Sequence, residues 1–169
     1  ILNTPKKNIS YLNKKLKTKL IKNKYFIFIK HPLSSELEDI DTQIEIALKS
    51  ANEFCEENNF KLVGITPNTD PGSEKILRIF EKYKNHKNLF FFKTLEREIF
   101  INLLRNSSFI AGNSSMGILE APFYKLPVVN IGSRQKGRIN AGNVEFVNYE
   151  QKKIIKAMNN AAFNKKYRK

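Results

Sequence analysis

The chain has 169 residues, of which 41% are hydrophobic and 27% are charged, and its formal net charge at pH 7 is +14. This length suits one domain with a substantial hydrophobic core, and a single cysteine, Cys55, excludes an internal disulfide. No apolar run approaches the roughly 20 residues that a membrane-spanning helix needs, and the first residues lack the apolar stretch of a signal peptide, so we expect a cytoplasmic protein without a membrane partner.

The expected elements alternate along the chain. Residues 1–22 are rich in lysine and place Ile9, Leu12, Leu16 and Leu20 at helical spacing, which predicts an interdomain helix or an amphipathic surface helix. From residue 23 onward, short apolar runs alternate with helical patterns. Strands are expected at 25–30, 60–66, 88–92, 107–111, 127–131 and 143–147, and helices at 36–58, from 73, at 95–105, 116–124 and 150–162.

This alternation predicts an α/β fold, a Rossmann-like doubly wound parallel sheet with helices on both faces. In such sheets, ligands bind beyond the carboxyl ends of the strands. Polar residues follow five consecutive predicted strands at that position: His31, Asn68 with Asp70, Thr94 beside Leu95, residues 113–115, and Ser133 with Arg134. We therefore expect a ligand cleft along this edge.

The most informative segment is 112–138, because five of the seven glycines lie within it or just beyond it. Glycine is used where the backbone takes unusual dihedral angles or approaches a partner closely. The run GNSS lies at a predicted strand-to-helix turn, where free amides attract anions. Ser114 and Ser115 could cap that helix and donate hydroxyl hydrogen bonds to a phosphate. An ordinary helix cap without a ligand is the alternative.

Further candidate binding residues lie before this segment and within it, and most of them have two interpretations. Glu120 could accept hydrogen bonds from two ribose hydroxyls or be a surface glutamate. Arg134 and Arg138 are rare arginines in a lysine-rich chain, which favours planar bidentate recognition. His31 could bind a phosphate or serve structurally in its His-Pro turn, and Asn68 could face a ligand or belong to a plain turn. No His, Cys or carboxylate lies near His31 at ligand spacing, so we expect no metal site.

The basic composition admits a module that binds nucleic acid. The lysines, however, are spread along the chain and are densest at its ends, rather than interleaved with aromatic residues. Solvated lysine faces with some attraction for anions are the favoured interpretation, and we expect no nucleic-acid partner.

Four motifs in order, HPLSSE at His31, PNTDPGS at 67–73, GNSSMGILEAP at 112–122 and PVVNIGSRQKGR at 127–138, resemble the hydrolysing UDP-N-acetylglucosamine 2-epimerases. The similarity is greatest to the branch that makes N-acetylmannosamine for sialic acid and related nonulosonic acids. It spans roughly residues 25–147.

The resemblance implies a glycosyltransferase-B-type architecture of two Rossmann-like domains with the sugar nucleotide between them. This chain matches the C-terminal half, so residues 23–169 would form the UDP-binding domain. By motif position, the implied contacts are His31 with the diphosphate, Asn68 with the nucleotide, the backbone near Leu95 with uracil, Ser114 and Ser115 with phosphate, Glu120 with the ribose hydroxyls, and Arg134 with the nucleotide side of the cleft.

The implied reaction eliminates UDP from UDP-N-acetylglucosamine to give a glycal, whose hydration yields N-acetylmannosamine, and it needs no metal or cofactor. The family's acid and base carboxylates lie in an N-terminal domain that this sequence lacks, so catalytic residues stay unknown here, with His31 the one candidate contributor. The fragment would need its own N-terminal domain as partner and would be inactive alone; a homo-oligomer is an open expectation. The alternatives are a glycosyltransferase of the same fold that uses a UDP-sugar donor, and the basic nucleic-acid-binding module.

Overall fold

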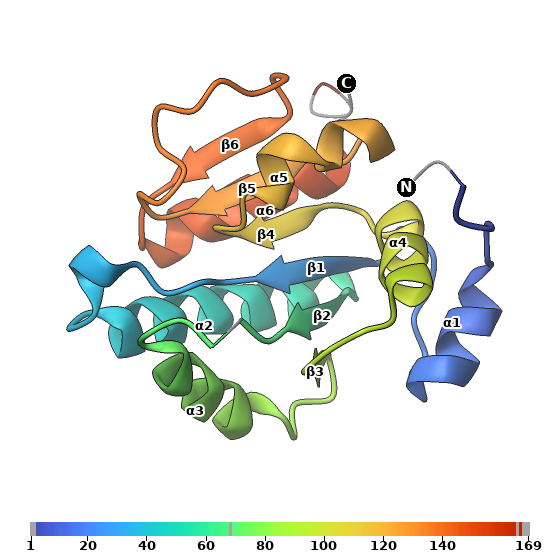
Figure 1. The fold of residues 1–169 in the computed structure, drawn as a ribbon, viewed down its shortest axis with the longest axis horizontal. Coiled ribbons are helices and arrows are strands. Elements are labelled where there is room, and N and C mark those ends of the chain that lie inside the picture. The colour runs from blue at the N-terminus through green and yellow to red at the C-terminus, as the bar shows by residue number, and fades with distance from the viewer. Residues whose placement is uncertain (1–2, 68, 165, 167–169) are drawn as a thin grey trace.

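Six parallel strands form one sheet in the order β3-β2-β1-β4-β5-β6 in the computed structural model, which describes residues 3–67, 69–164 and 166 (Figure 1). The strands are β1 (Tyr25–Ile29), β2 (Lys61–Ile65), β3 (Leu89–Phe92), β4 (Ile110–Gly112), β5 (Val128–Ile131) and β6 (Val144–Val147). All five neighbouring pairs run parallel. The chain winds outward from β1 in one direction and from β4 in the other, so the predicted doubly wound α/β fold is confirmed.

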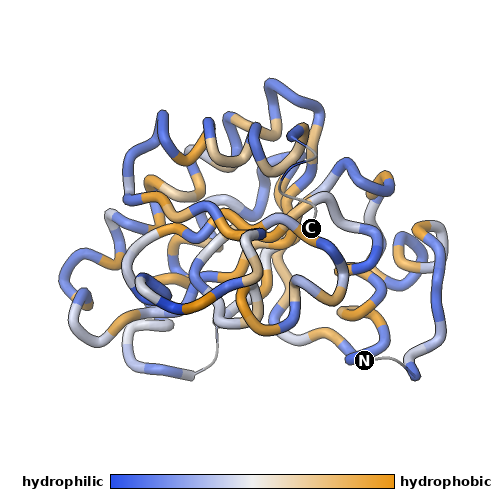
Figure 2. The backbone as a smooth tube through the Cα atoms, turned by 90° about the horizontal axis from the view of Figure 1, so that it is seen from above, coloured by the Kyte–Doolittle hydropathy of each residue, from blue (hydrophilic) through white to orange (hydrophobic). Residues whose placement is uncertain are grey.

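The helices cover both faces of this sheet. They are α1 (Ile9–Leu16), α2 (Ile40–Asn58), α3 (Ser73–Tyr83), α4 (Arg97–Asn106), α5 (Met116–Leu119) and α6 (Gln151–Phe163), with short 3-10 turns η1 (Ser34–Glu36) and η2 (Ala121–Tyr124). Side chains alternate along β1: Phe26 and Phe28 pack among residues of α2, α3 and α6, whereas Tyr25, Ile27 and Ile29 pack among residues of α1, α4 and α5. The apolar residues accordingly gather at the centre of the molecule (Figure 2).

Several boundaries differ from the sequence prediction; the strand expected at 107–111, for example, is Ile110–Gly112. The helix expected from residue 36 begins at Ile40, after the 3-10 turn η1. The helix expected over 116–124 divides into α5 and η2, since Pro122 has no N–H to continue the α-helical ladder. Leu20 lies outside α1, because Lys17 takes the left-handed conformation (φ 54°) and ends that helix.

The lysine-rich N-terminal segment packs onto the face of the sheet that α4 and α5 also cover. Leu12 of α1 is fully buried in the same apolar cluster as residues of α4, and α1 contacts α4 directly. Contact of α1 with a further domain stays a prediction. None of the described helices is both long enough and apolar enough to cross a bilayer.

Candidate functional site

The loops after β1 and β4 meet at the point where the strand order reverses. His31 follows β1, and Asn113 follows β4 directly. The His31 N–H donates to Asn113 Oδ1 at 2.7 Å, and Asn113 Nδ2 donates to the His31 carbonyl at 2.9 Å. The Asn113 N–H donates to the Ile29 carbonyl at 3.0 Å, and Asn113 is 1% exposed. One buried asparagine therefore fixes both loops in a single arrangement.

Gly112 allows β4 to approach β1 this closely. Its φ is +124°, a conformation that L side chains rarely adopt, and a Cβ placed on it would lie 1.9 Å from the Ile29 carbonyl oxygen. The glycine that opens the GNSS run is thus required by backbone contact with β1. Its role here is steric.

The two serines of this run lie half-buried between β4 and α5. The Ser114 hydroxyl accepts weakly from the Met116 N–H, at 3.4 Å. Ser115 takes the N-cap position of α5, but its side chain makes no capping hydrogen bond, so the capping prediction is wrong for Ser115. Among the described residues, the amides of Ser114 and Ser115 have no recorded acceptor. The turn can therefore offer hydroxyl and amide donors to an anion, whereas a four-residue helix contributes little dipole.

The loop after β5 joins the same cluster. Arg134 Nη1 donates to the Asn113 carbonyl at 3.0 Å, and Gln135 Nε2 donates to the same oxygen at 3.1 Å. Gln135 is 2% exposed, and Arg134 is half-buried. Arg134 is thereby held beside the turn that carries Ser114.

The surroundings of His31 favour the neutral form of its imidazole. Burial is the main cause that lowers its pKa, the Arg134 and Lys30 cations lower it further, and the Asp70 carboxylate opposes them. Its Nδ1 is buried and has no hydrogen-bond partner among the described residues. His31 therefore brings an uncharged ring with unused hydrogen-bonding capacity to the junction of β1 and β4.

Behind His31 lies Lys30, which is 1% exposed. Its Nζ is 3.4 Å from the His31 carbonyl, 3.5 Å from Gln43 Oε1 and 5.2 Å from the centre of the Tyr149 ring. Burial lowers the pKa of Lys30 to about 8, although the Glu36 carboxylate opposes this. Sequence reasoning did not select Lys30; its only signal was a lysine that ends an otherwise apolar strand.

Glu36 ties the loop after β1 to the loop after β5. Its carboxylate accepts a short hydrogen bond from the Ser133 hydroxyl and another from Gln43 Nε2 at 2.8 Å. These bonds, that from Ser133 foremost, lower the pKa of Glu36. Side-chain hydrogen bonds thus connect the three loops that follow β1, β4 and β5.

Leu95 and Glu120 make no hydrogen bond to this cluster of contacts, whereas Arg138 is joined to it through Gln135. Leu95 is half-buried in the loop between β3 and α4, where it packs against the apolar cluster that includes residues of α1, α4 and α5. Glu120 follows α5 and is half-buried, and its carboxylate makes no hydrogen bond or ion pair with the described residues. Arg138 is exposed and donates to Gln135 Oε1 at 2.8 Å. Asn68 lies outside the described residues.

The arrangement suits an anionic ligand. It combines serine hydroxyls, free amides and a guanidinium beside a neutral imidazole at a topological switch point. Within residues 3–67, 69–164 and 166, no group of three or more His, Cys, Asp or Glu side chains could hold a metal ion.

The chain is similar in sequence to known proteins. A family model described as UDP-N-acetylglucosamine 2-epimerase matches residues 2–169. The UDP-N,N'-diacetylbacillosamine 2-epimerase (hydrolyzing) of Legionella pneumophila is 33% identical over 138 residues, which are 82% of this chain and 36% of the relative. The GDP/UDP-N,N'-diacetylbacillosamine 2-epimerase (hydrolyzing) of Campylobacter jejuni is 34% identical over 145 residues, covering 82% of this chain and 37% of the relative.

A solved structure shares the fold. The UDP-GlcNAc 2-epimerase of Methanocaldococcus jannaschii, in complex with UDP-GlcNAc and UDP, superposes with a TM-score of 0.72 at 18% identity, over 95% of this chain and 43% of that one. The chain thus spans little more than a third of the length of the curated relatives that it matches.

Proposed function

This chain belongs to the UDP-N-acetylglucosamine 2-epimerase family, and from that premise we propose that it is the UDP-binding half of a hydrolysing sugar-nucleotide 2-epimerase. The observation that carries the proposal is the junction of the loops after β1, β4 and β5 at Asn113, which gathers anion-binding groups where doubly wound sheets bind nucleotides.

In this proposal, the diphosphate lies against the turn after β4. The hydroxyls and amides of Ser114 and Ser115 donate to its oxygens, and the Arg134 guanidinium and the neutral His31 ring complete the grip. Glu120 accepts from the ribose hydroxyls, since its carboxylate is not engaged by the described residues. Asn68 and the backbone near Leu95 line the nucleotide and uracil positions.

These groups would assist the chemistry by stabilising the leaving group. When UDP is eliminated from the sugar, negative charge develops on the diphosphate, and donors already fixed around it lower the barrier. The acid and base carboxylates would come from a further, N-terminal domain, which fits a chain that spans 36% and 37% of two curated relatives. We therefore expect the 169-residue chain to bind UDP weakly and to turn over no sugar nucleotide.

Calorimetric titration of the chain with UDP tests the binding half of the proposal. Arg134→Ala and Glu120→Ala should each weaken binding by about tenfold, the effect of one lost charge-assisted contact. The matched controls are Arg78→Ala and Glu57→Ala, which remove exposed side chains of the same types on α3 and α2. No affinity for UDP, or an affinity that neither site variant changes, would refute the proposal.

The chemistry needs the longer protein that contains this chain. Incubated with UDP-N-acetylglucosamine, or in a second arm with a UDP-linked diacetamido sugar, it should release UDP and a free 2-epimer without any acceptor. The alternative, a glycosyltransferase of the same fold, would keep the sugar nucleotide intact until an acceptor is added. That outcome would replace the epimerase proposal.

A further inference from the structure

A pocket of about 780 Å³ lies at the opposite edge of the sheet from the cluster around Asn113. Its wall includes Lys22, which precedes β1, the last turn of α4, which leads into β4, and η2, which leads toward β5. The pocket and the cluster around Asn113 are separated by the length of β1, which is five residues or about 16 Å. The pocket is therefore distinct from the proposed UDP site, and its volume is within the range of small-molecule sites.

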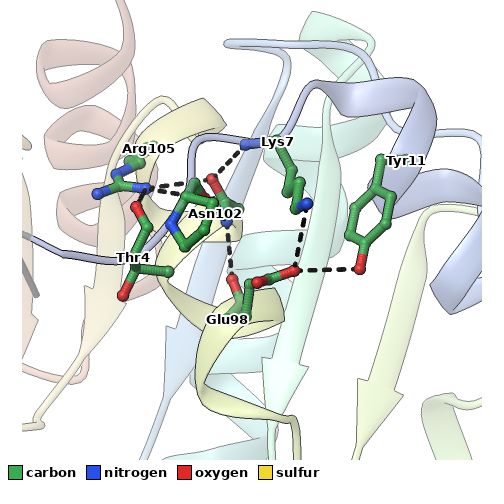
Figure 3. A network of polar contacts seen from close by, with 7 residues as sticks. Thr4, Lys7, Tyr11, Glu98, Asn102 and Arg105 are labelled. Carbon is green, nitrogen blue, oxygen red and sulfur yellow. Dashed lines mark hydrogen bonds and ion pairs between the residues drawn. The ribbon is translucent and has the colours of Figure 1, made fainter.

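Polar contacts hold one wall of this pocket in place (Figure 3). The Lys7 N–H donates to Asn102 Oδ1 at 2.9 Å, and Asn102 Nδ2 donates to the Pro5 carbonyl at 3.0 Å. Arg105 Nη1 donates to the Thr4 carbonyl at 2.9 Å. The segment before α1 is thus fixed along α4, and the lysines that it carries are presented from an ordered backbone.

The pocket wall is strongly cationic. Lys6, Lys7, Lys22 and Arg105 line it, and none of the other described residues in its wall carries a carboxylate. Lys7 is paired with Glu98 at 3.9 Å, whereas neither Lys6 nor Lys22 forms an ion pair within the described part of the chain. Positive charge that lines a concave surface concentrates anions there.

Two aromatic residues add features that charge alone does not explain. The Tyr124 hydroxyl is buried and has no hydrogen-bond partner among the described residues. Its neighbour Phe123 is 71% exposed, which is unusual for a large apolar side chain beside a pocket. The exposed ring of Phe123 beside several cations matches a ligand that carries both phosphate and a planar ring.

We propose that this pocket is a second ligand site that binds a nucleotide, with its phosphates against Lys6, Lys22 and Arg105 and its base against the ring of Phe123. The site accounts for part of the lysine excess that the UDP cluster leaves unused. The simpler alternative is that the cations only offset the negative carboxyl end of α4, which requires no ligand.

Calorimetric titration of the 169-residue chain with ADP, and separately with inorganic pyrophosphate, distinguishes these readings. The double variant Lys6→Gln/Lys22→Gln should weaken ADP binding by about tenfold or more, as expected for two lost charge contacts, whereas the control Lys49→Gln/Lys152→Gln, with the same charge change on exposed helix positions, should change it less than about twofold. Phe123→Ala should weaken ADP binding and leave pyrophosphate binding unchanged. Arg134→Ala weakens any ADP binding at the cluster around Asn113, and ADP binding at this second pocket should persist in it.

Three outcomes would overturn the proposal: no ADP binding at millimolar concentration, an ADP affinity lost with Arg134→Ala but kept in the lysine double variant, or equal binding of pyrophosphate and ADP with no effect of Phe123→Ala. Each of these can occur whether or not UDP binds at the cluster around Asn113.

Discussion

Asn113 and His31, 82 positions apart in the sequence, are joined by two hydrogen bonds that run in opposite directions between one side-chain amide and one backbone unit. The amide satisfies both the N–H and the C=O of His31, so no other side chain of similar size can replace it. Because Asn113 also accepts from Arg134 and Gln135 through its carbonyl, it holds together three of the loops at the carboxyl edge.

Asn113→Ala should therefore destabilise the fold. It removes the acceptor of the His31 N–H and leaves the His31 C=O with only the long contact to Lys30 Nζ, at 3.4 Å, and the expected loss is about 2–4 kcal/mol of unfolding free energy. Urea unfolding measures it. Asn85→Ala, at an exposed position in a turn, is the control and should stay within about 0.5 kcal/mol. A loss as small as that of the control would mean that the two bonds do not fix these loops.

Gly112→Ala should be among the most damaging substitutions in the chain. The new methyl group would meet the Ile29 carbonyl at 1.9 Å, where backbone faces backbone and neither side can yield. Gly137→Ala is the matched control, since Gly137 also has a positive φ, +81°, but nothing lies within 4 Å of its Cβ position. We expect a cost of about 1 kcal/mol for Gly137→Ala and more than about 3 kcal/mol for Gly112→Ala. Equal melting temperatures for the two variants would contradict the steric role of Gly112.

Lys30→Met should stabilise the protein at neutral pH. The folded state lowers the pKa of Lys30 from 10.5 to about 8, so burying its cation disfavours folding wherever the lysine is charged in both states. The penalty is on the order of 3 kcal/mol below pH 8, and methionine, which fills a similar volume, should recover part of it.

The pH dependence gives this prediction its sign. Between about pH 8 and 10.5 the unfolded state binds more protons at Lys30 than the folded state, so the contribution of Lys30 to stability becomes less unfavourable as pH rises. The advantage of Lys30→Met over the parent should therefore shrink across that window. Cys55, whose pKa burial raises to about 12, acts in the opposite sense above pH 9 in both proteins and cancels in the difference. If the difference in unfolding free energy between Lys30→Met and the parent stays constant from pH 7 to 10, burial does not lower the pKa of Lys30.

The order of the elements was predictable because hydrophobic periodicity is local. The sequence also predicted that His31, Asn113 and Arg134 lie at one edge of the sheet, since in a parallel sheet every strand ends on the same side. The partnership of Asn113 with His31 was not predictable in this way, because it depends on the register between β1 and β4. The burial of Lys30 was not predicted. The sequence does not show that α2 and Tyr149 pack around the residue that ends the first predicted strand.

The division of the helix expected over 116–124 had a local signal in the sequence, which the helical spacing concealed. Pro122 lies inside an apolar spacing that is typical of a helix, yet its missing N–H limits α5 to four residues. The roles of Leu95 and Glu120 stay predictions, since neither forms a hydrogen bond to the cluster around Asn113.

The location of UDP on the chain tests the central proposal most directly. In a titration of the ¹⁵N-labelled 169-residue chain with UDP, followed by amide chemical shifts, we predict that the largest changes occur at residues 30 and 31, 113–116 and 133–135, the loops that Asn113 connects. UDP binding that leaves these three loops unchanged, with shifts confined to other parts of the sheet, would contradict the account.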